Sequence, residues 1–245
     1  TGAIYRARTE AEIPRIEPCL RLAFRRRFAP APGVRDGEHA IAVAGGVAAL
    51  DGVSFDLRAG EVHALCGENG AGKSTLIKLL AGVHPHGSYD GQLLMDGQPA
   101  RFRSTRDAER AGIAIIHQEL ALFGGLTVAE NLFLNDLPTR GGRVDWPGLH
   151  ARATALLDET QLALDPEARV DTLGIAQQQL VEIARALARR PRILVLDEPT
   201  AALATHEIAV LLDIVRRLRD RGVTCVYISH KLDEVFSVAD RITVL

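Results

Sequence analysis

The sequence predicts an α/β fold with a mostly parallel β-sheet. Its first support is a set of short apolar runs, each suited to one buried strand: EVHAL (61–65), IAII (113–116), RILVLDEP (192–199) and VTCVYIS (223–229). Stretches with apolar residues at helical spacing lie between several of these runs, and the clearest is AQQQLVEIARALARR (176–190). Strands that alternate with helices favour a parallel sheet covered on both faces.

Turn residues and capping residues predict the elements that precede IAII (113–116). VSFDL (53–57) is predicted as a strand that turns at RAG into the next strand. DGQLLMDGQPARF (90–102) is predicted as a hairpin with Gly-containing turns. Ser104 and Asp107 form a predicted capping box, which indicates a helix that ends at Gly112.

The second half of the chain is richer in helix. From Thr127 to about Leu164 the pattern is mostly helical, with an interruption at LPTRGGRVDWPG. Thr205 is expected to cap a further helix. The sequence ends on RITVL (241–245), an apolar strand with no polar tail, so we expect a truncated chain or a fragment.

Residues 1–38 differ from the rest of the chain. They contain four prolines and an Arg run at 25–27, and they show no clear period. This pattern favours a disordered or loosely docked extension, or a start site placed too early. The alternative is a basic segment that contacts anionic lipid. Regular structure is expected from near Ile41.

Composition limits the remaining possibilities. A chain of 245 residues suits one domain, or one domain with an inserted subdomain. Because 29 basic residues face 31 acidic ones, no nucleic-acid partner is expected. Cys66 and Cys225 lie in strand-like runs and are predicted to be small buried hydrophobes, which fits a reducing cytosol. No signal peptide and no apolar run of about 18 residues is found, so any membrane span belongs to another chain.

One Gly-rich stretch carries the strongest chemical signal. GENGAGKST matches the phosphate-binding pattern G-x-x-x-x-G-K-[ST]. The glycines let backbone N–H groups turn inward, and a helix that follows adds its positive end. The lysine is expected to reach the β and γ phosphates, and the serine hydroxyl to reach Mg²⁺. The residues are Gly67, Glu68, Asn69, Gly70, Ala71, Gly72, Lys73, Ser74 and Thr75.

The alternative is a chance match in a Gly-rich chain. The context argues against it, because an apolar strand precedes the loop and TLIKLLAG (75–82) follows it with helical spacing and a terminal Gly82. Strand, Gly-rich loop and helix form the setting that a phosphate loop requires. The sequence therefore predicts binding of a nucleoside triphosphate.

A pair of acids at the end of the run ILVLDEPT (193–200) indicates hydrolysis. Asp197 is placed to hold Mg²⁺, directly or through water. Glu198 follows it and is placed to orient and deprotonate the attacking water. The alternative is two solvated acids at a strand end. The Asn-Lys-x-Asp run of a guanine-specific site is absent, which removes the main support for a GTPase.

Five motifs, in this order, resemble those of the ATP-binding-cassette (ABC) ATPases: GENGAGKST, HQEL (117–120), LGIAQQQ (173–179), ILVLDEPT and YISH (227–230). The resemblance covers about residues 41–245. Within the family the chain is most similar to the ATP-binding subunit of bacterial importers for ribose, xylose, arabinose or galactose. Such subunits usually carry two cassettes, and this chain would be the first.

The resemblance implies an architecture as well as an activity. The core would be a P-loop NTPase domain of the RecA-like type, with an antiparallel β subdomain and an inserted helical subdomain at about 119–180. The cassette would occupy residues 39–245, after an extension at 1–38. The expected activity is hydrolysis of ATP with Mg²⁺, coupled to transport.

The resemblance also implies roles for single residues. Two cassettes would face head to tail, and each would present its signature to the ATP on the other; here the signature residues are Leu173, Gly174, Ala176 and Gln177. Gln118 would contact Mg²⁺ and the water and couple to the membrane subunit. His230 would contact the γ-phosphate, although a lone His is more often structural. The implied Mg²⁺ ligands are Ser74, Gln118 and Asp197.

Four positions depart from the family pattern. Gly174 stands where the signature has a serine that donates to the γ-phosphate. Ala44 stands where an aromatic side chain stacks on adenine, and Ala204 where an aspartate links the two sites. Ala176 replaces the first signature glycine, a substitution familiar in the sugar-import group.

Three functions therefore stay open. The first is an import motor at the cytoplasmic face of the inner membrane, bound peripherally to transmembrane permease subunits and working with a second cassette and, indirectly, an extracytoplasmic sugar-binding protein. The second is a non-transport cassette ATPase that acts on DNA or ribosomes, which the short segment after Gln118 and the balanced charge disfavour. The third is a regulatory module that binds nucleotide without efficient turnover, which Gly174 and Ala44 permit.

Overall fold

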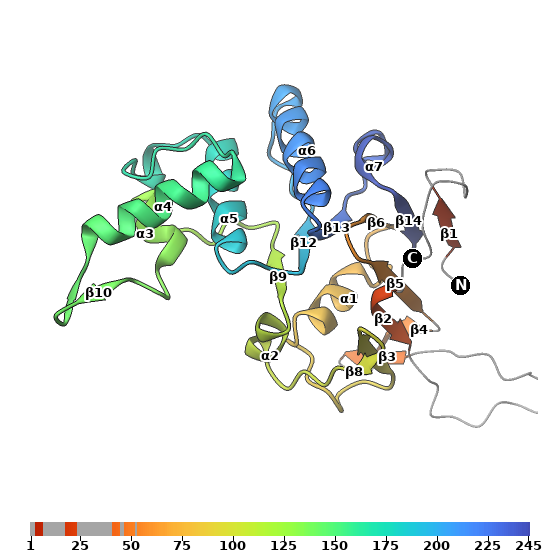
Figure 1. Cartoon of the computed structure of the whole chain (residues 1–245). Coiled ribbons are helices and arrows are strands. Elements are labelled where there is room, and N and C mark those ends of the chain that lie inside the picture. The colour runs from red at the N-terminus through yellow and green to blue at the C-terminus, as the bar shows by residue number, and fades with distance from the viewer. Residues whose placement is uncertain (1–2, 7–17, 24–40, 45–46, 52) are drawn as a thin grey trace, which may run out of the picture.

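A six-stranded sheet forms the centre of the protein in the computed structural model, which describes residues 3–6, 18–23, 41–44, 47–51 and 53–245 (Figure 1). The strand order is β1-β14-β6-β13-β12-β9. The five strands from β14 to β9 pair in parallel, and β1 pairs antiparallel with β14. Their bounds are β1 Ala3–Arg6, β6 Val62–Cys66, β9 Ile113–Ile116, β12 Ile193–Asp197, β13 Thr224–Ile228 and β14 Arg241–Val244. The predicted mostly parallel sheet is confirmed.

The central strands are apolar because both faces of the sheet are covered. Side chains alternate along a strand, so neighbours enter different cores. In β12, Leu194 and Leu196 join the core formed with the helices of one face. Ile193 and Val195 join a second core with α1 and the smaller β-elements. All four side chains are almost wholly buried.

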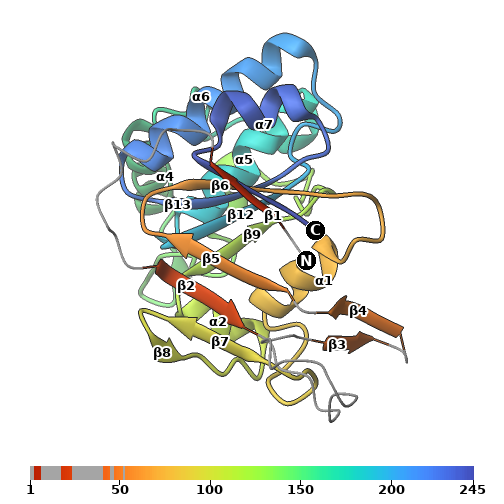
Figure 2. The same cartoon turned by 90° about the vertical axis from the view of Figure 1, so that its right-hand side faces the viewer.

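The two faces carry different elements, as Figure 2 shows. The helices α5 (Ile175–Leu187), α6 (Thr205–Asp220) and α7 (Leu232–Val238) lie over one face. Over the other lie α1 (Lys73–Leu80), α2 (Thr105–Arg110) and two small antiparallel sheets. Their strands are β2 Pro18–Ala23, β5 Ser54–Arg58, β7 Gln92–Met95 and β8 Gln98–Pro99 in one sheet, and β3 Ile41–Ala44 and β4 Val47–Asp51 in the other.

The antiparallel region contains two elements that the sequence predicted. The hairpin expected at 90–102 is formed by β7 and β8, with the register Met95↔Gln98. The capping box of α2 is also present, because Asp107 Oδ2 accepts a hydrogen bond from the Ser104 N–H at 3.1 Å.

The helical region lies at one end of the sheet, around α3 (Val128–Phe133) and α4 (Trp146–Thr160) (Figure 1). The interruption predicted at LPTRGGRVDWPG contains a small hairpin of β10 (Thr139–Arg140) and β11 (Arg143–Val144). A 3₁₀ turn at Val170–Thr172 leads from this region into α5.

Two predicted boundaries are wrong. Regular structure begins before Ile41, because β1 pairs with β14 and β2 lies between β5 and β7. The extension predicted at 1–38 otherwise falls outside the described residues. The N-cap of α6 is Ala204, with Thr205 as the first helical residue. Glu207 compensates for the missing cap side chain by accepting a hydrogen bond from the Ala204 N–H at 2.8 Å.

The expectations about cysteine and membrane segments are also addressed by the structure. Cys66 and Cys225 are free and buried, as predicted. Burial raises the pKa of both thiols. Within the described ranges, no helix combines the length and the apolar character needed to cross a bilayer.

A buried charge cluster joins the antiparallel region to the central sheet. Arg241 on β14 donates to Glu61 Oε1 at 3.1 Å and to Asp56 Oδ1 at 3.0 Å. His63 Nδ1 lies 3.1 Å from Glu61 Oε1, and its Nε2 lies 2.7 Å from Thr243 Oγ1. Burial raises the pKa of Asp56, but the hydrogen bond and charge of Arg241 outweigh it and hold that pKa below its usual value. Arg241 is therefore paired with two carboxylates through Nη1 and Nη2, while its Nε is buried without a hydrogen-bond partner among the described residues.

Replacing Arg241 tests how far the fold depends on this cluster. Removal of one partner of a buried ion pair leaves an uncompensated charge, so Arg241→Ala should lower the free energy of unfolding by about 3–5 kcal/mol in denaturant titration. Arg192→Ala is the control, because its pair with Asp96 is half exposed and should contribute about 0–1 kcal/mol. Equal losses in the two variants would contradict the role of the cluster.

Candidate nucleotide-binding and hydrolysis site

The predicted site residues follow the ends of four neighbouring strands. The loop 67–72 follows β6, Gln118 follows β9, Glu198 follows β12, and His230 follows β13. Because these strands are parallel, their carboxyl ends lie at one edge of the sheet. The topology therefore brings together residues that are up to 163 positions apart in the chain, from Gly67 to His230.

The Gly-rich loop has the backbone that its sequence predicts. Gly67, Gly70 and Gly72 all have positive φ angles, of 152°, 88° and 99°. Lys73 begins α1 and folds back, so that its Nζ donates to the carbonyl oxygens of Gly67 at 2.7 Å and Glu68 at 2.9 Å. The ammonium group thus lies over the loop predicted to hold the phosphates.

Gly72 is required for two reasons. Its φ of 99° disfavours any residue with a side chain. A Cβ at this position would also collide with the Leu50 side chain and lie 2.6 Å from the Ala49 carbonyl oxygen. At Gly70, by contrast, a Cβ would meet nothing within 4 Å. Gly72 therefore allows the loop to pack against β4.

The three predicted catalytic residues are in direct contact. Glu198 Oε1 lies 3.2 Å from His230 Nδ1, and Gln118 Nε2 donates to Glu198 Oε2 at 3.5 Å. The Glu198 N–H donates to the Ile228 carbonyl oxygen at 3.0 Å. Glu198 has a φ of 47°, which is uncommon for a residue with a Cβ. Its carboxylate therefore stands between two other functional side chains.

Asp197 lies beside this group and within the electrostatic reach of the Gly-rich loop. Burial raises its pKa, as does the neighbouring Glu198, whereas His117 and Lys73 lower it. Among the described residues no group of three or more His, Cys, Asp or Glu side chains is arranged to hold a metal. Mg²⁺ needs no such group, because it binds through one or two carboxylates together with substrate phosphates and water. Asp197 and the Ser74 hydroxyl fit that requirement.

The signature residues lie at the N-terminus of α5. Gly174 is the N-cap, and its N–H donates to Gln177 Oε1 at 3.3 Å. Gln178 Nε2 donates to the carbonyl oxygens of Val170 and Leu173, at 3.3 and 3.0 Å, and holds the preceding turn against the helix. Ala176 lies in the first turn, where N–H groups have no intrahelical partner.

The structure does not join this signature to the Gly-rich loop of the same chain. Figure 1 shows α5 grouped with α3 and α4, whereas α1 lies beyond the central sheet. Of the other departures from the family pattern, Ala204 caps α6 and Ala44 ends β3, where its side chain lies outside the described residues. A Cβ at Gly174 would meet nothing within 4 Å, so the position has room for a serine.

The loop after Gln118 is held by side chains that the sequence reasoning missed. Ala121 is bonded at both backbone groups: its N–H donates to Glu182 Oε1 at 3.1 Å, and Arg185 Nη1 donates to its carbonyl oxygen at 2.6 Å. Asn131 holds Phe123 in the same way: its Oδ1 accepts from the Phe123 N–H at 2.9 Å, and its Nδ2 donates to the Phe123 carbonyl oxygen at 3.0 Å. The sequence did contain one sign of this clamp, because Glu182 is a charged residue within the apolar pattern of α5.

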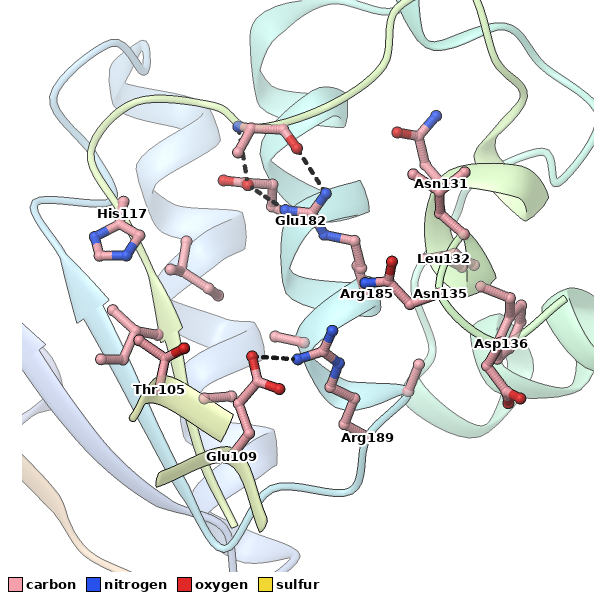
Figure 3. A pocket seen from close by; sticks show the side chains of 18 of the residues that line it. Thr105, Glu109, His117, Asn131, Leu132, Asn135, Asp136, Glu182, Arg185 and Arg189 are labelled. Carbon is pink, nitrogen blue, oxygen red and sulfur yellow. Dashed lines mark hydrogen bonds and ion pairs between the residues drawn. The ribbon is translucent and has the colours of Figure 1, made fainter. Parts of the chain in front are cut away.

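These clamps line a cavity of about 680 Å³ between the central sheet and the helical region. Figure 3 shows Glu182 and Arg185 on one wall and Asn131 and Asn135 on another, while the ion pair of Glu109 with Arg189 joins α2 to the end of α5. Within the described part of the chain, Glu182 Oε2 is buried without a hydrogen-bond partner. The cavity therefore adjoins the loop that carries Gln118.

The fold and the site together define a P-loop nucleotide-binding protein. The family model described as "ABC transporter" matches residues 50–201. The chain belongs to the ABC transporter family, as the motifs predicted.

Within this family, the chain is similar to ATP-binding proteins of sugar import. The chain is 57% identical over 200 residues to the "Xylose import ATP-binding protein XylG" of Moorella thermoacetica, a match of 82% of this chain and 40% of that protein. It is 53% identical over 201 residues to the protein of the same name from Pectobacterium atrosepticum, covering 82% and 39%. These names confirm the predicted resemblance to sugar-import subunits. The chain spans about 40% of the length of the curated relatives it matches.

Solved structures support the fold. The chain superposes on a nucleotide-free ATP-binding cassette of an ABC transporter with a TM-score of 0.75 at 25% identity, over 93% of this chain and 87% of the other. The ADP conformation of MJ1267, another such cassette, gives the same TM-score and coverage at 26% identity. The predicted P-loop NTPase fold class is thereby confirmed.

The two glycines of the loop give a matched test of ATP binding. Each alanine variant carries about 1–3 kcal/mol of backbone strain, but only Gly72→Ala adds a collision with β4. Gly72→Ala should therefore weaken ATP binding by at least about tenfold more than Gly70→Ala, because tenfold corresponds to about 1.4 kcal/mol. Isothermal titration with Mg-ATP measures both. Equal weakening would show that contact with β4 is unimportant.

Proposed function

We propose that this chain is an ATP-hydrolysing cassette of a bacterial monosaccharide importer, and the first of two cassettes in its subunit. The observation that carries the proposal is the 57% identity to a xylose import ATP-binding protein across 82% of this chain. Xylose is accordingly the first sugar to test, although the importer's other subunits would make the choice.

The site supports hydrolysis rather than binding alone. Glu198 is hydrogen-bonded on both carboxylate oxygens, to His230 and to Gln118, at the edge of the sheet where the phosphate loop lies. A carboxylate held in this way is suited to orient and deprotonate an attacking water. Lys73 would bind the β and γ phosphates once they displace its bonds to the loop.

Mg²⁺ is the proposed metal. Ser74 and Asp197 would hold it, with Gln118 nearby, and the ion would neutralise charge on the phosphates when bound. Asp197 keeps its place because it ends a buried strand that is paired on both sides.

The signature requires a second cassette. Within this chain, Leu173 to Gln177 lie on the helical region and are not joined to the Gly-rich loop (Figure 1). We therefore assign them to the ATP on a facing cassette, in a head-to-tail sandwich. The free N–H groups in the first turn of α5 suit a γ-phosphate.

The proposed setting is the cytoplasmic face of the inner membrane, with the cassette bound peripherally to transmembrane permease subunits. The cavity beside the loop after Gln118 is the surface that we assign to the permease. Its buried Glu182 Oε2, which has no partner within the described residues, would accept a donor from that subunit. An extracytoplasmic sugar-binding protein would act indirectly, and no nucleic acid is expected.

A second candidate is a regulatory module that binds ATP and turns it over poorly. Gly174 favours it, because the donor hydroxyl at that position is missing. Loss of one donor to a developing charge costs about 1–3 kcal/mol. Room for a serine side chain at Gly174 makes this candidate testable by restoration.

Steady-state ATPase rate against protein concentration tests the proposal. Because two cassettes would complete each site, the rate should rise faster than linearly. Glu198→Gln should lower kcat by about 10²-fold or more, since general-base catalysis contributes about 10²–10⁴-fold, while ATP binding is retained. Malachite-green release of phosphate gives the rate, and isothermal titration gives the affinity.

Gly174→Ser separates the two candidates. If ATP binds but the chain shows no turnover, and Gly174→Ser restores turnover, the chain is a binding module that has lost one donor. Absence of turnover in both, with the Glu198→Gln variant indistinguishable from the parent, would refute the ATPase proposal.

A further inference from the structure

The buried carboxylate of Glu234 lies close to the site and has no role in the proposed mechanism. Glu234 lies on α7, and its residue is 7% exposed. Its Oε2 accepts hydrogen bonds from Thr200 Oγ1 at 2.6 Å, from the Tyr227 hydroxyl at 2.9 Å and from Ser229 Oγ at 3.5 Å. A single oxygen atom thus gathers three hydroxyl groups.

These hydroxyl groups belong to the segments that carry the site. Thr200 lies two residues after Glu198, and Ser229 directly precedes His230. Tyr227 lies on β13, the strand that ends beside them. Glu234 therefore bridges the two turns that carry Glu198 and His230.

The second oxygen of Glu234, Oε1, makes no hydrogen bond within the described residues and faces the ammonium group of Lys231. Lys231 Nζ lies 3.2 Å from Glu234 Oε1 and also donates to the Thr200 carbonyl oxygen at 3.1 Å. A buried carboxylate without such partners would be strongly unfavourable. Burial raises the pKa of Tyr227, and the charge of Glu234 raises it further, so the phenol keeps the proton that it donates.

The turn at Glu198 needs support of this kind. Its φ of 47° is sparsely populated for a residue with a side chain, and such conformations persist only when the surroundings hold them. Thr200 lies in the same turn, where Ala201 N–H donates to the Glu198 carbonyl oxygen at 3.2 Å. A strong bond on Thr200 thus restrains the backbone that aims the Glu198 carboxylate.

We propose that Glu234 is a positioning residue for hydrolysis: by binding Thr200 and Ser229 together, it fixes the separation and orientation of Glu198 and His230. This inference rests on the proposed ATPase function. Glu234 does not touch the reacting atoms, so its removal should disturb the chemical step and leave the phosphate loop intact.

Glu234→Gln keeps the shape of the side chain and removes its charge. Because a misplacement of about 1 Å costs about 10²-fold in rate, kcat should fall by about 10- to 100-fold while the KM for ATP stays within about twofold. Thr200→Val, which deletes the shortest bond of the bridge, should act in the same direction. Asp56→Asn is the control, since it neutralises a buried carboxylate in the distant cluster on β5.

A double-variant cycle distinguishes positioning from general support of the fold. If Glu234 acts through the contact of Glu198 with His230, adding Glu234→Gln to His230→Ala should lower kcat little further. Additive losses, an unchanged kcat in Glu234→Gln, or an equal loss in Asp56→Asn would each overturn the proposal.

A spectroscopic measurement keeps the inference separate from the ATPase proposal. The ¹⁵N chemical shift of His230 Nδ1 reports its contact with Glu198 without any turnover. Glu234→Gln should move this shift in the same direction as Glu198→Ala, and Asp56→Asn should leave it unchanged. If the parent chain hydrolyses no ATP but the shift moves, the ATPase proposal fails and the bridge stands; an unmoved shift overturns the bridge.

Discussion

The parallel pairing of four strands is the constraint on which the site depends. β6, β13, β12 and β9 each end in a turn at the same edge of the sheet, and each turn carries one part of the site. The strands are held there by two cores, because alternate side chains of one strand enter opposite layers. A change of register in one strand would displace a functional residue and transfer apolar side chains between the cores. The packing that stabilises the sheet therefore also sets the positions of the site residues.

The charged side chains at this edge of the sheet are placed to bind a charged ligand. Lys73 satisfies its ammonium on two carbonyl oxygens, which are weaker partners than phosphate. Asp197 has a raised pKa from burial and from its neighbour Glu198, so an added cation would favour its charged form. Lys73 and Asp197 are therefore both available to phosphates and to the Mg²⁺ that we propose.

The local signals of the sequence predicted most of this arrangement. Buried runs marked the strands, and the Gly-rich loop, the acids after ILVL and the histidine after YIS marked the strand ends. The side-chain clamps on Ala121 and the bond between Glu234 and Thr200 were not predicted, because they join residues 34 to 64 positions apart through buried polar atoms. Periodicity predicts which side of a helix is buried, but it does not predict which residues pair with a charged side chain on that side. The N-cap of α6 was misplaced for a related reason: Glu207 caps the backbone of Ala204 from within the helix.

The helix α5 connects two parts of the proposed mechanism. Its N-terminus carries the signature at Gly174, and two turns later Glu182 and Arg185 hold both backbone groups of Ala121. Ala121 lies three residues after Gln118, whose side chain donates to Glu198. A helix moves as a rigid unit, so a facing nucleotide that pulls on the signature would also displace the loop that carries Gln118. The contact between Gln118 and Glu198 is the longest in the site, at 3.5 Å, and is therefore the one that such a displacement would change most readily.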